Sequence, residues 1–298
     1  MAVSGGPDSA ALLLLMHECF TGRVFAATVD HRLRAEAAKE AQFVARLCSE
    51  RHIPHSILVP AAPITGNLQS AARTARYALL ADWANVHQCA HIATAHHADD
   101  QLETVLMRLA RGSGVGGLSG VRAVNGRIIR PLLNFTKSEL FEICEAAGIT
   151  AVQDPSNRDL DYDRVRMREW LAASPGPLSA AAAVRSASAL ADASEALDWM
   201  TGKLAAERIH LSPDTCSLTL NPADLPRELK RRLLLQVLAR IEPEINMRGS
   251  TIERGLDSLL DSQTITLGNT LCHGGALWRF TAAPARSQAK TDVNNSAS

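Results

Sequence analysis

Short apolar runs alternate with longer amphipathic stretches along the first 150 residues of the chain. Strands are expected at Met1–Val3, Val24–Asp30, His55–Val59 and His91–Ala95. Apolar residues at helical spacing predict helices over Ala10–Met16, Ala35–His52, Asn67–His87 and Asp99–Arg111. Strands separated by helices of this length favour an α/β domain, in which a parallel sheet is covered by helices on both faces.

A second region is expected after the sequence ASPGP at Ala173–Pro177, which interrupts the helical pattern before it. Beyond this break the pattern predicts a long Ala-rich helix over 178–209, a strand over 217–220, a basic helix over 228–241 and short β-like pieces between 264 and 281. We therefore expect a first domain at 1–172, a linker at 173–177 and a smaller, mostly helical domain at 178–284. The polar tail at 285–298 is expected to be disordered.

The composition is that of a globular protein with no general affinity for polyanions. Hydrophobic residues make up 46% of the chain and charged residues 21%, and 31 basic residues balance 31 acidic ones. A specific RNA would have to be held by local patches and by shape, because a strongly basic surface is missing. No apolar stretch approaches the roughly 20 residues that span a bilayer. We expect no membrane partner and a cytoplasmic location.

The six cysteines are far apart, and none forms a C-x-x-C pair. This spacing argues against a zinc ribbon, a redox dithiol and a clustered iron–sulfur site. Buried, reduced thiols are the expected state.

The sequence SGGPDS at Ser4–Ser9 has the composition of an anion-binding turn. Gly5 and Gly6 allow backbone paths that other residues avoid, and Pro7 suits the first turn of a helix. A strand, a glycine turn and a helix start bring free N–H groups and the positive end of a helix dipole together. The alternative interpretation is an ordinary strand-to-helix turn.

Two further polar clusters also follow expected strands, Asp30-His31 and His96-His97. Because the carboxyl ends of parallel strands meet at one edge of a sheet, these clusters and the glycine turn are expected to share a site. The chain has no G-x-x-x-x-G-K-[ST] motif. GSGVGG at 112–117 fits G-x-G-x-x-G, but it follows a helix and is interpreted as a loop.

The segment HHADDQLET places acids at the start of a helix whose apolar face carries Leu102, Val105, Leu106 and Leu109. His96, Asp99, Asp100 and Glu103 gather at its N-terminal end. These acids could complement the helix dipole, or they could bind Mg²⁺ and take a proton from a nucleophile. Zinc is disfavoured because no cysteine is nearby.

Two segments carry candidate phosphate-binding arginines. Gln69, Arg73 and Arg76 form one polar stripe on an expected helix, which is either solvated or directed at a phosphate. The segment DPSNRDLDYDRVRMR contains Arg164, Arg166 and Arg168. On a helix Arg164 and Arg168 share a face and Arg166 points away from them. Two interpretations of these arginines remain open: a salt-bridged surface and contact with RNA phosphates.

In this order the motifs resemble those of the tRNA(Ile)-lysidine synthetases, members of the PP-loop or N-type ATP pyrophosphatase group. SGGPDS alone is shared with GMP, NAD and asparagine synthetases and with tRNA thiolation enzymes. The narrower resemblance rests on DHRLR, ARTARY, HHADDQLETVLMRLARGSG, RPLLNFTKSEL and DPSN. It is close over residues 1–170 and looser beyond them.

The resemblance implies a Rossmann-like adenine nucleotide alpha hydrolase fold and a two-step ligation that uses ATP and Mg²⁺. ATP would adenylate the wobble cytidine of an isoleucine tRNA with a CAU anticodon, releasing pyrophosphate. Free L-lysine would then attack the C2 carbon and expel AMP, giving lysidine. The oligomeric state is left open, with a homodimer as one option.

The resemblance also implies roles for individual residues. The ATP phosphates would be bound by Ser4, Gly5, Gly6, Pro7, Asp8 and Ser9. Asp8 would help to hold Mg²⁺, Arg76 would contact the adenylated intermediate, and His96 and Asp100 would lie at the reacting centre. tRNA contacts would come from Arg164, Arg166, Arg168 and the second domain. The residue that takes the lysine proton is not assigned.

Two departures from the family pattern bear on these expectations. Relatives usually have a longer strand before the loop than Met1–Val3, so an earlier start of the chain is one expectation. Long family members carry an additional C-terminal domain, so tRNA discrimination here is expected to use fewer contacts.

Two other functions were weighed against the ligase. A tRNA thiolation enzyme of the same fold would need clustered cysteines, which the spacing disfavours. A nucleotide-binding module without catalysis is disfavoured by the intact glycine turn and the HHADD cluster.

Overall fold

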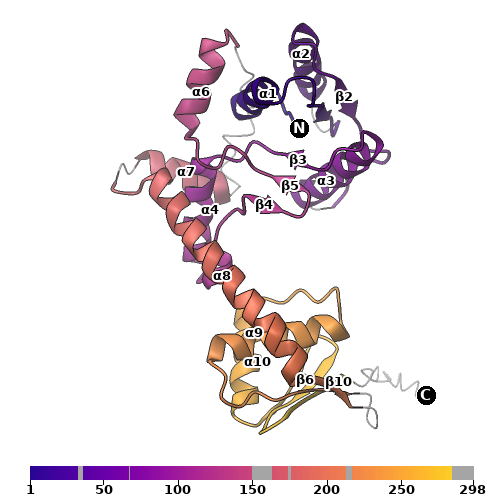
Figure 1. Ribbon diagram of the computed structural model, residues 1–298, viewed down its shortest axis with the longest axis vertical. Helices are drawn as coiled ribbons and strands as arrows, with labels where there is room; N and C mark the ends of the chain where they lie inside the picture. The colour runs from indigo at the N-terminus through magenta and orange to yellow at the C-terminus, as the bar shows by residue number, and fades with distance from the viewer. Residues whose placement is uncertain (33–35, 67, 150–162, 174–175, 213–216, 284–298) are drawn as a thin grey trace, which may run out of the picture. The chain divides into compact units, whose positions relative to one another are not determined.

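The computed structural model describes residues 1–32, 36–66, 68–149, 163–173, 176–212 and 217–283. The chain forms two compact units, Met1–Asp192 and a second that begins at Ala193, so the division falls inside helix α8 (Ala180–Arg208). Figure 1 shows the elements of each unit. Of the predicted linker, residues 174–175 lie outside the described residues, as does the predicted tail at 285–298.

The first unit contains the predicted parallel sheet. β1 (Ala26–Val29) pairs in parallel with β2 (His55–Leu58), and β3 (Ile92–Ala93) pairs in parallel with β5 (Ile128–Ile129). The first residues of the chain connect these pairs: the Ala2 N–H donates to the Ala93 carbonyl and the Val3 N–H donates to the Ala27 carbonyl, both at 2.9 Å. The expected first strand therefore runs between β1 and β3, although only Ala2 makes a ladder bridge.

β4 (Val124–Asn125) adds an antiparallel edge by pairing with β5. This hairpin was not predicted from the sequence, although Gly126 opens the two-residue turn between the paired residues Asn125 and Ile128, a position at which glycine is typical of tight hairpins. Gly126 has a φ of 56°, in the left-handed region that such a turn requires.

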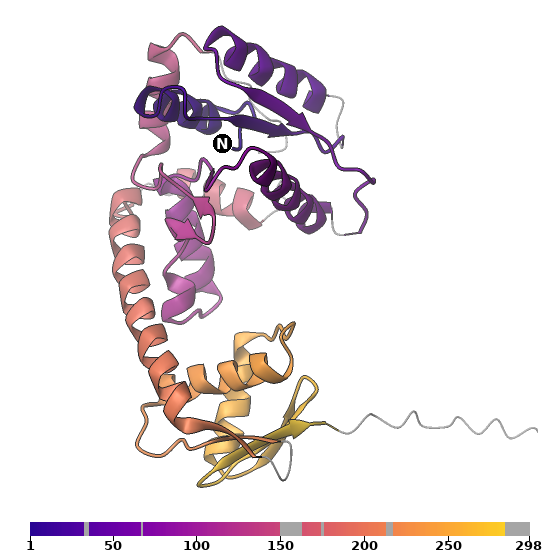
Figure 2. The same cartoon turned by 45° about the vertical axis from the view of Figure 1, so that its right-hand side comes forward.

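Helices cover both faces of this sheet, as predicted (Figures 1 and 2). Side chains alternate along each strand, so neighbouring residues enter opposite cores. Ala26 and Ala93 pack on the side of α1 (Pro7–Cys19), α2 (Glu36–Glu50) and α6 (Lys137–Ala146). Ala27 and Ile92 pack on the other side, against Leu80, Trp83 and Ala84 of α3 (Leu68–Val86).

The first unit also contains α4 (Ala98–Ala110), α5 (Val115–Leu118), α7 (Asp163–Ala173) and the start of α8. The prediction of a loop at GSGVGG was wrong for residues 115–117, which lie in the single-turn helix α5 after Gly114. Both α5 and α7 pack against α4. α7 thereby brings residues 163–173 next to α4.

The second unit packs helices on a five-stranded antiparallel sheet of order β6-β7-β10-β9-β8. Its strands are β6 (Ile209–Ser212), β7 (Ser217–Leu220), β8 (Thr264–Leu267), β9 (Thr270–His273) and β10 (Trp278–Ala282). The end of α8, α9 (Arg227–Ile241) and α10 (Gly249–Leu260) supply its helices. Trp278 and Phe280 lie in its core with Leu233 and Leu256. The predicted basic helix and β-like pieces are confirmed, whereas α10 was not predicted.

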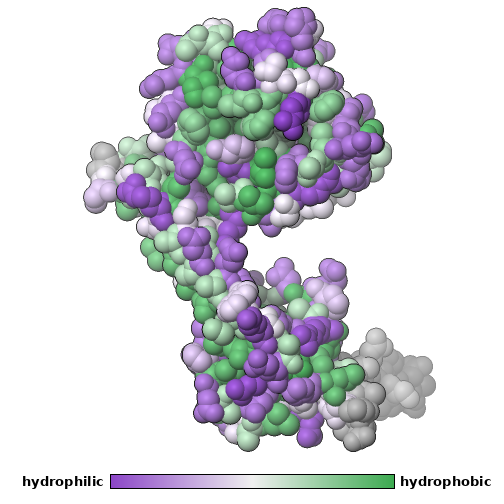
Figure 3. Space-filling view, viewed as in Figure 1, coloured by the Kyte–Doolittle hydropathy of each residue, from purple (hydrophilic) through white to green (hydrophobic). Residues whose placement is uncertain are grey.

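The surface of the second unit mixes hydrophobic and hydrophilic residues in the view of Figure 3. Within the described ranges, no helix combines the length and apolar character needed to cross a membrane. Five cysteines are described, and all are free thiols. Cys48, Cys144 and Cys272 are buried as expected, but Cys19 is exposed, and Cys216 lies outside the described residues.

Candidate active site

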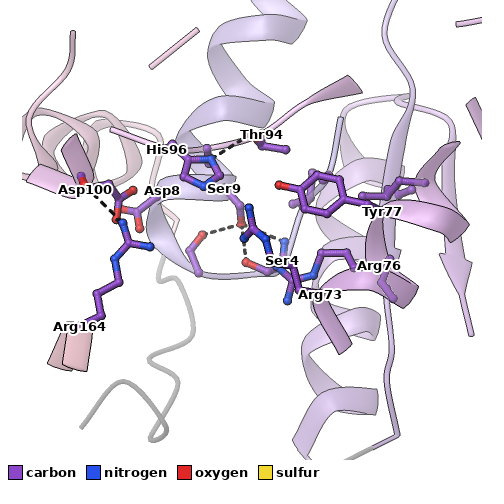
Figure 4. Close-up of a pocket in the computed structure, with 17 residues that line it drawn as sticks. Ser4, Asp8, Ser9, Arg73, Arg76, Tyr77, Thr94, His96, Asp100 and Arg164 are labelled. Atoms are coloured by element: carbon purple, nitrogen blue, oxygen red, sulfur yellow. Dashed lines mark hydrogen bonds and ion pairs between the residues drawn. The ribbon is translucent and has the colours of Figure 1, made fainter. Parts of the chain in front are cut away.

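The SGGPDS segment forms a tight turn between the first strand and α1 (Figure 4). Gly5 has a φ of +89°, a backbone conformation that L side chains rarely adopt. The Ser9 hydroxyl accepts a hydrogen bond from the Ser4 N–H and donates one to the Gly6 carbonyl, both at 3.0 Å. Gly6 precedes the helix and has no side chain to cap it, so N–H groups of the first turn are available to an anion.

A cavity of about 240 Å³ opens beside this turn. The turn contributes Ser4, Gly6, Asp8 and Ser9 to its lining. The structure also brings Arg76, His96 and Asp100 to the cavity, so the four residues expected at a reacting centre meet in one place. Asp30 and His31, expected at the same edge of the sheet, are not among the lining residues.

Three carboxylates surround the buried ring of His97, which was expected at this edge of the sheet but without a role of its own. Its Nε2 lies 3.7 Å from Asp8 Oδ2 and 3.5 Å from Asp100 Oδ2, and its Nδ1 lies 3.5 Å from Asp99 Oδ2. Burial alone would lower the pKa of His97, but Asp99, Asp100 and Asp8 together outweigh it and raise the pKa. The raised pKa favours the imidazolium form, whose charge is opposite to that of the acids around it.

His96 points into the cavity, and its pKa is shifted in the opposite direction to that of His97. Its Nδ1 lies 3.0 Å from the Thr94 hydroxyl. Burial lowers the pKa of His96 to about 4, and the nearby cations Arg130 and Arg164 act in the same direction against the attraction of Asp100. The ring is therefore neutral at pH 7.

Arg73, Arg76 and Tyr77 line the cavity across from the acids (Figure 4). The Arg73 guanidinium lies over the Tyr77 ring, 5.0 Å from its centroid. Within the described part of the chain, Arg76 has no carboxylate partner. Burial lowers the pKa of its guanidinium, which keeps its charge at neutral pH. Arg76 is thus available to a phosphate. Of the stripe predicted on this helix, the side chain of Gln69 lies outside the described residues.

α7 divides its three arginines as the helical spacing predicts. Arg164 and Arg168 face α4, where both contact Glu103. Arg166 lies on another side of the helix and pairs with Asp163. Only Arg164 of the three lines the cavity.

The first turns of three helices lie together at the site. The Lys137 N–H at the start of α6 donates to Asp99 Oδ2 in the first turn of α4, at 2.8 Å. The Ala98 N–H at the start of α4 donates to the Phe135 carbonyl, also at 2.8 Å. His97 links this junction to Asp8 in the first turn of α1. The positive ends of three helix dipoles therefore lie close to one another.

The residues at this junction are compatible with Mg²⁺. Among the described residues, no group of three or more His, Cys, Asp or Glu side chains has a metal-binding arrangement. The buried Asp8 Oδ1, however, has no hydrogen-bond partner, and burial raises the pKa of this carboxyl. Mg²⁺ is commonly held by one or two carboxylates together with substrate phosphates, and an unpartnered carboxylate oxygen beside a phosphate loop fits that donor set.

Comparison with known proteins agrees with this geometry. Residues 1–174 match the model of the PP-loop domain family. A protein from Zymomonas mobilis named tRNA(Ile)-lysidine synthase is 44% identical to this chain, over 97% of this chain and 89% of that protein. A protein of the same name from Novosphingobium aromaticivorans is 42% identical, over 95% and 88%. This chain belongs to the tRNA(Ile)-lysidine synthase family.

Membership of the tRNA(Ile)-lysidine synthase family confirms the resemblance that the motifs suggested. The matched PP-loop region contains every residue that lines the cavity. Among solved structures, a U34-tRNA thiolase from Methanococcus maripaludis with a [4Fe-4S] cluster is 19% identical, with a TM-score of 0.54 over 64% of this chain and 70% of that one. That likeness supports the fold alone. No cysteine lines the cavity described here.

Proposed function

We propose that this chain ligates lysine to the C2 carbon of the wobble cytidine in an isoleucine tRNA with a CAU anticodon, and that ATP drives the reaction. The proposal rests on the family assignment together with one structural observation. The SGGPDS turn, Asp8, Arg76, His96 and Asp100 line a single cavity in the PP-loop region. A tRNA substrate and ATP would place this activity in the cytoplasm.

In the first step the cytosine carbonyl oxygen attacks the α-phosphorus of ATP, and the bond to the pyrophosphate group breaks. The N–H groups at the start of α1 would hold the departing pyrophosphate, whose negative charge increases as that bond breaks. Arg73 and Arg76 both line the cavity without a carboxylate partner among the described residues, and Arg76 would neutralise charge on the phosphoryl group in transfer. The turn has no P-loop lysine, which suits a reaction that releases the outer two phosphates together.

Asp8 would contribute to holding Mg²⁺, which when bound neutralises phosphate charge. Its Oδ1 is buried without a partner among the described residues, so this oxygen can bind a cation without giving up an existing hydrogen bond. The His97 ring lies 3.7 Å and 3.5 Å from the Oδ2 atoms of Asp8 and Asp100, and its raised pKa favours the charged form, which would offset the repulsion between the two acids.

In the second step the lysine Nζ attacks the C2 carbon, and the C2–O bond breaks to release AMP. The ammonium form of lysine, with an ordinary pKa of about 10.4, must first lose a proton to become a nucleophile. Asp8, Asp100 and neutral His96 are the cavity groups able to accept it. Because His96 is uncharged at pH 7, it does not repel an incoming ammonium group.

The reacting cytidine must leave the stack of the anticodon loop to enter the cavity, which is inexpensive for a single-stranded nucleotide. For contacts with the rest of the tRNA we propose the exposed Arg166 on α7 and the second unit. Arg164 and Arg168 hold the largely buried carboxylates of α4, whereas the carboxylate that pairs with Arg166, that of Asp163, is exposed.

Mass spectrometry tests the proposal directly. The chain is incubated with a CAU-anticodon isoleucine tRNA transcript, ATP and isotopically labelled lysine, and the nucleoside at the wobble position is analysed. We expect labelled lysidine, with one AMP and one pyrophosphate per product. A transcript with uridine at the wobble position should give none. ADP in place of AMP, or no modified nucleoside with an intact transcript, would contradict the ligase assignment.

A nucleotide-binding module without catalysis predicts a different result. Such a module would bind ATP but would not exchange labelled pyrophosphate into it in the presence of tRNA. The Asp8→Ala variant provides the control, because in a ligase it should lose the exchange that the parent chain shows.

A further inference from the structure

The face of α7 that meets α4 carries two arginines, and both hold the same two carboxylates. Arg164 Nε lies 2.8 Å from Glu103 Oε2, and Arg168 Nε lies 2.5 Å from Glu103 Oε1. The Nη2 atom of each guanidinium lies 3.3 Å from Asp100 Oδ1. The two arginines therefore grip Asp100 and Glu103 from one side.

The four residues differ in their relation to the cavity. Asp100 and Arg164 line it, whereas Arg168 and Glu103 do not. The Glu103 side chain is only 5% exposed, so its carboxylate needs the arginines beside it as counter-ions. Arg168 reaches the cavity only through the carboxylates that it holds.

Asp100 is fixed at both oxygens by this arrangement. Its Oδ2 accepts a hydrogen bond from the His97 N–H at 3.2 Å, and its Oδ1 faces the two arginines. Asp100 and Glu103 are one helical turn apart on α4, where two like charges repel each other. Without the arginines, that repulsion would favour other rotamers of Asp100.

We propose that Arg168 is a positioning residue that sets the Asp100 carboxylate in the cavity, directly and through Glu103, and does not serve as a tRNA contact. To bind a tRNA phosphate, Arg168 would have to release Glu103 Oε1 and leave this nearly buried carboxylate with Arg164 as its remaining counter-ion, which is unfavourable. This inference rests on the proposed ligase function, in which Asp100 lies at the reacting centre.

Kinetics of two arginine variants from the same helix separate positioning from tRNA binding. We expect Arg168→Ala to lower kcat for lysidine formation at least tenfold and to change the KM for tRNA less than twofold. Arg168→Lys should recover part of kcat, since the charge remains but the fork does not. Arg166→Ala should show the reverse pattern, a higher KM for tRNA at an unchanged kcat. Arg46→Ala, an exposed arginine on α2, controls for the loss of a surface charge.

A double-mutant cycle tests the route through Glu103. If Arg168 acts through Glu103, the double variant Arg168→Ala, Glu103→Gln should lose little more kcat than the more severe single variant. Losses that multiply would show that the two residues act separately. A raised KM for tRNA with kcat unchanged in Arg168→Ala would overturn the proposal and return Arg168 to the tRNA contacts.

Amide hydrogen exchange tests the contact independently of turnover. The His97 N–H is bonded to Asp100, so its exchange reports whether that carboxylate stays in place. We expect the peptide covering residues 95–103 to exchange faster in Arg168→Ala and at the parent rate in Arg166→Ala. If the parent chain forms no lysidine, the proposed function fails while this measurement still decides the positioning role. Unchanged exchange in Arg168→Ala would refute it.

Discussion

Replacing His96 by asparagine should reduce the loss of stability that acid causes in this protein. The ring is neutral in the folded chain because burial lowers its pKa to about 4, against 6.5 in an unfolded chain. As the pH falls from 7.5 toward 4, the His96 ring becomes protonated in the unfolded chain but stays mostly neutral in the folded one. The folded state therefore loses stability across this window.

The size of the effect follows from proton linkage. Near pH 7.5 the ring is largely neutral in both states and contributes almost nothing. At pH 5 it is almost fully protonated in the unfolded chain and mostly neutral in the folded one. With the two pKa values above, the difference amounts to about 2 kcal/mol of unfolding free energy between pH 7.5 and pH 5. Asparagine cannot take up the proton, so this contribution should disappear in the His96→Asn variant.

Urea unfolding followed by far-UV circular dichroism, at several pH values between 7.5 and 5, measures the effect. The second unit is identical in parent and variant, so its contribution cancels in the comparison. His52→Asn is the matched control, because His52 is exposed and Asn tolerates its φ of 55°. Equal losses of stability in His96→Asn and the parent would refute the interpretation of His96 as a buried neutral ring.

Three further predictions concern the turn, the core and the cavity. Gly5→Ala, at a φ of +89°, should destabilise the fold by about 1–2 kcal/mol and weaken ATP binding in calorimetry. Gly22→Ala, at a φ of +72° in open space, should affect stability alone. Equal ATP affinities in the two variants would contradict this prediction. Leu12→Ala should lower the free energy of unfolding in urea by about 2–5 kcal/mol because Leu12 is fully buried. Leu109 is 58% exposed, so Leu109→Ala should lower it by less than about 0.5 kcal/mol. Similar losses in the two variants would argue against the core described. Arg76→Ala should reduce lysidine formation at least about a hundredfold with an unchanged unfolding midpoint, and near-parental turnover would exclude a phosphate role.

The parallel sheet and the position of the site could be predicted because they follow from local patterns. Period-2 and period-3.6 hydrophobicity placed most of the elements of the first unit, and the rule that ligands bind at the carboxyl ends of parallel strands placed the cavity. The start of α6 was also visible in principle. Thr136 and Glu139 form a capping box, in which the Thr136 N–H donates to Glu139 Oε2 at 2.7 Å, and its T-x-x-E spacing is a known signal.

Contacts between distant segments could not be predicted in the same way. The role of His97 depends on Asp8, which is 89 residues away and meets it only because α1 and α4 start side by side. The spacing of Arg164 and Arg168 indicated a shared face, but not that this face would meet Glu103. The strand order of the second unit likewise depends on tertiary pairing, since β10 lies between β7 and β9.

The junction of three helix starts has a consequence for how a chain without net charge can handle highly charged substrates. Peptide dipoles attract phosphate at short range, and their effect fades within a turn of the helix. Lysine-rich surfaces, by contrast, draw in any nucleic acid and weaken steeply as salt is added. An enzyme that uses backbone polarity at one turn to hold nucleotide should therefore have little general affinity for bulk RNA, leaving selection of the correct tRNA to shape.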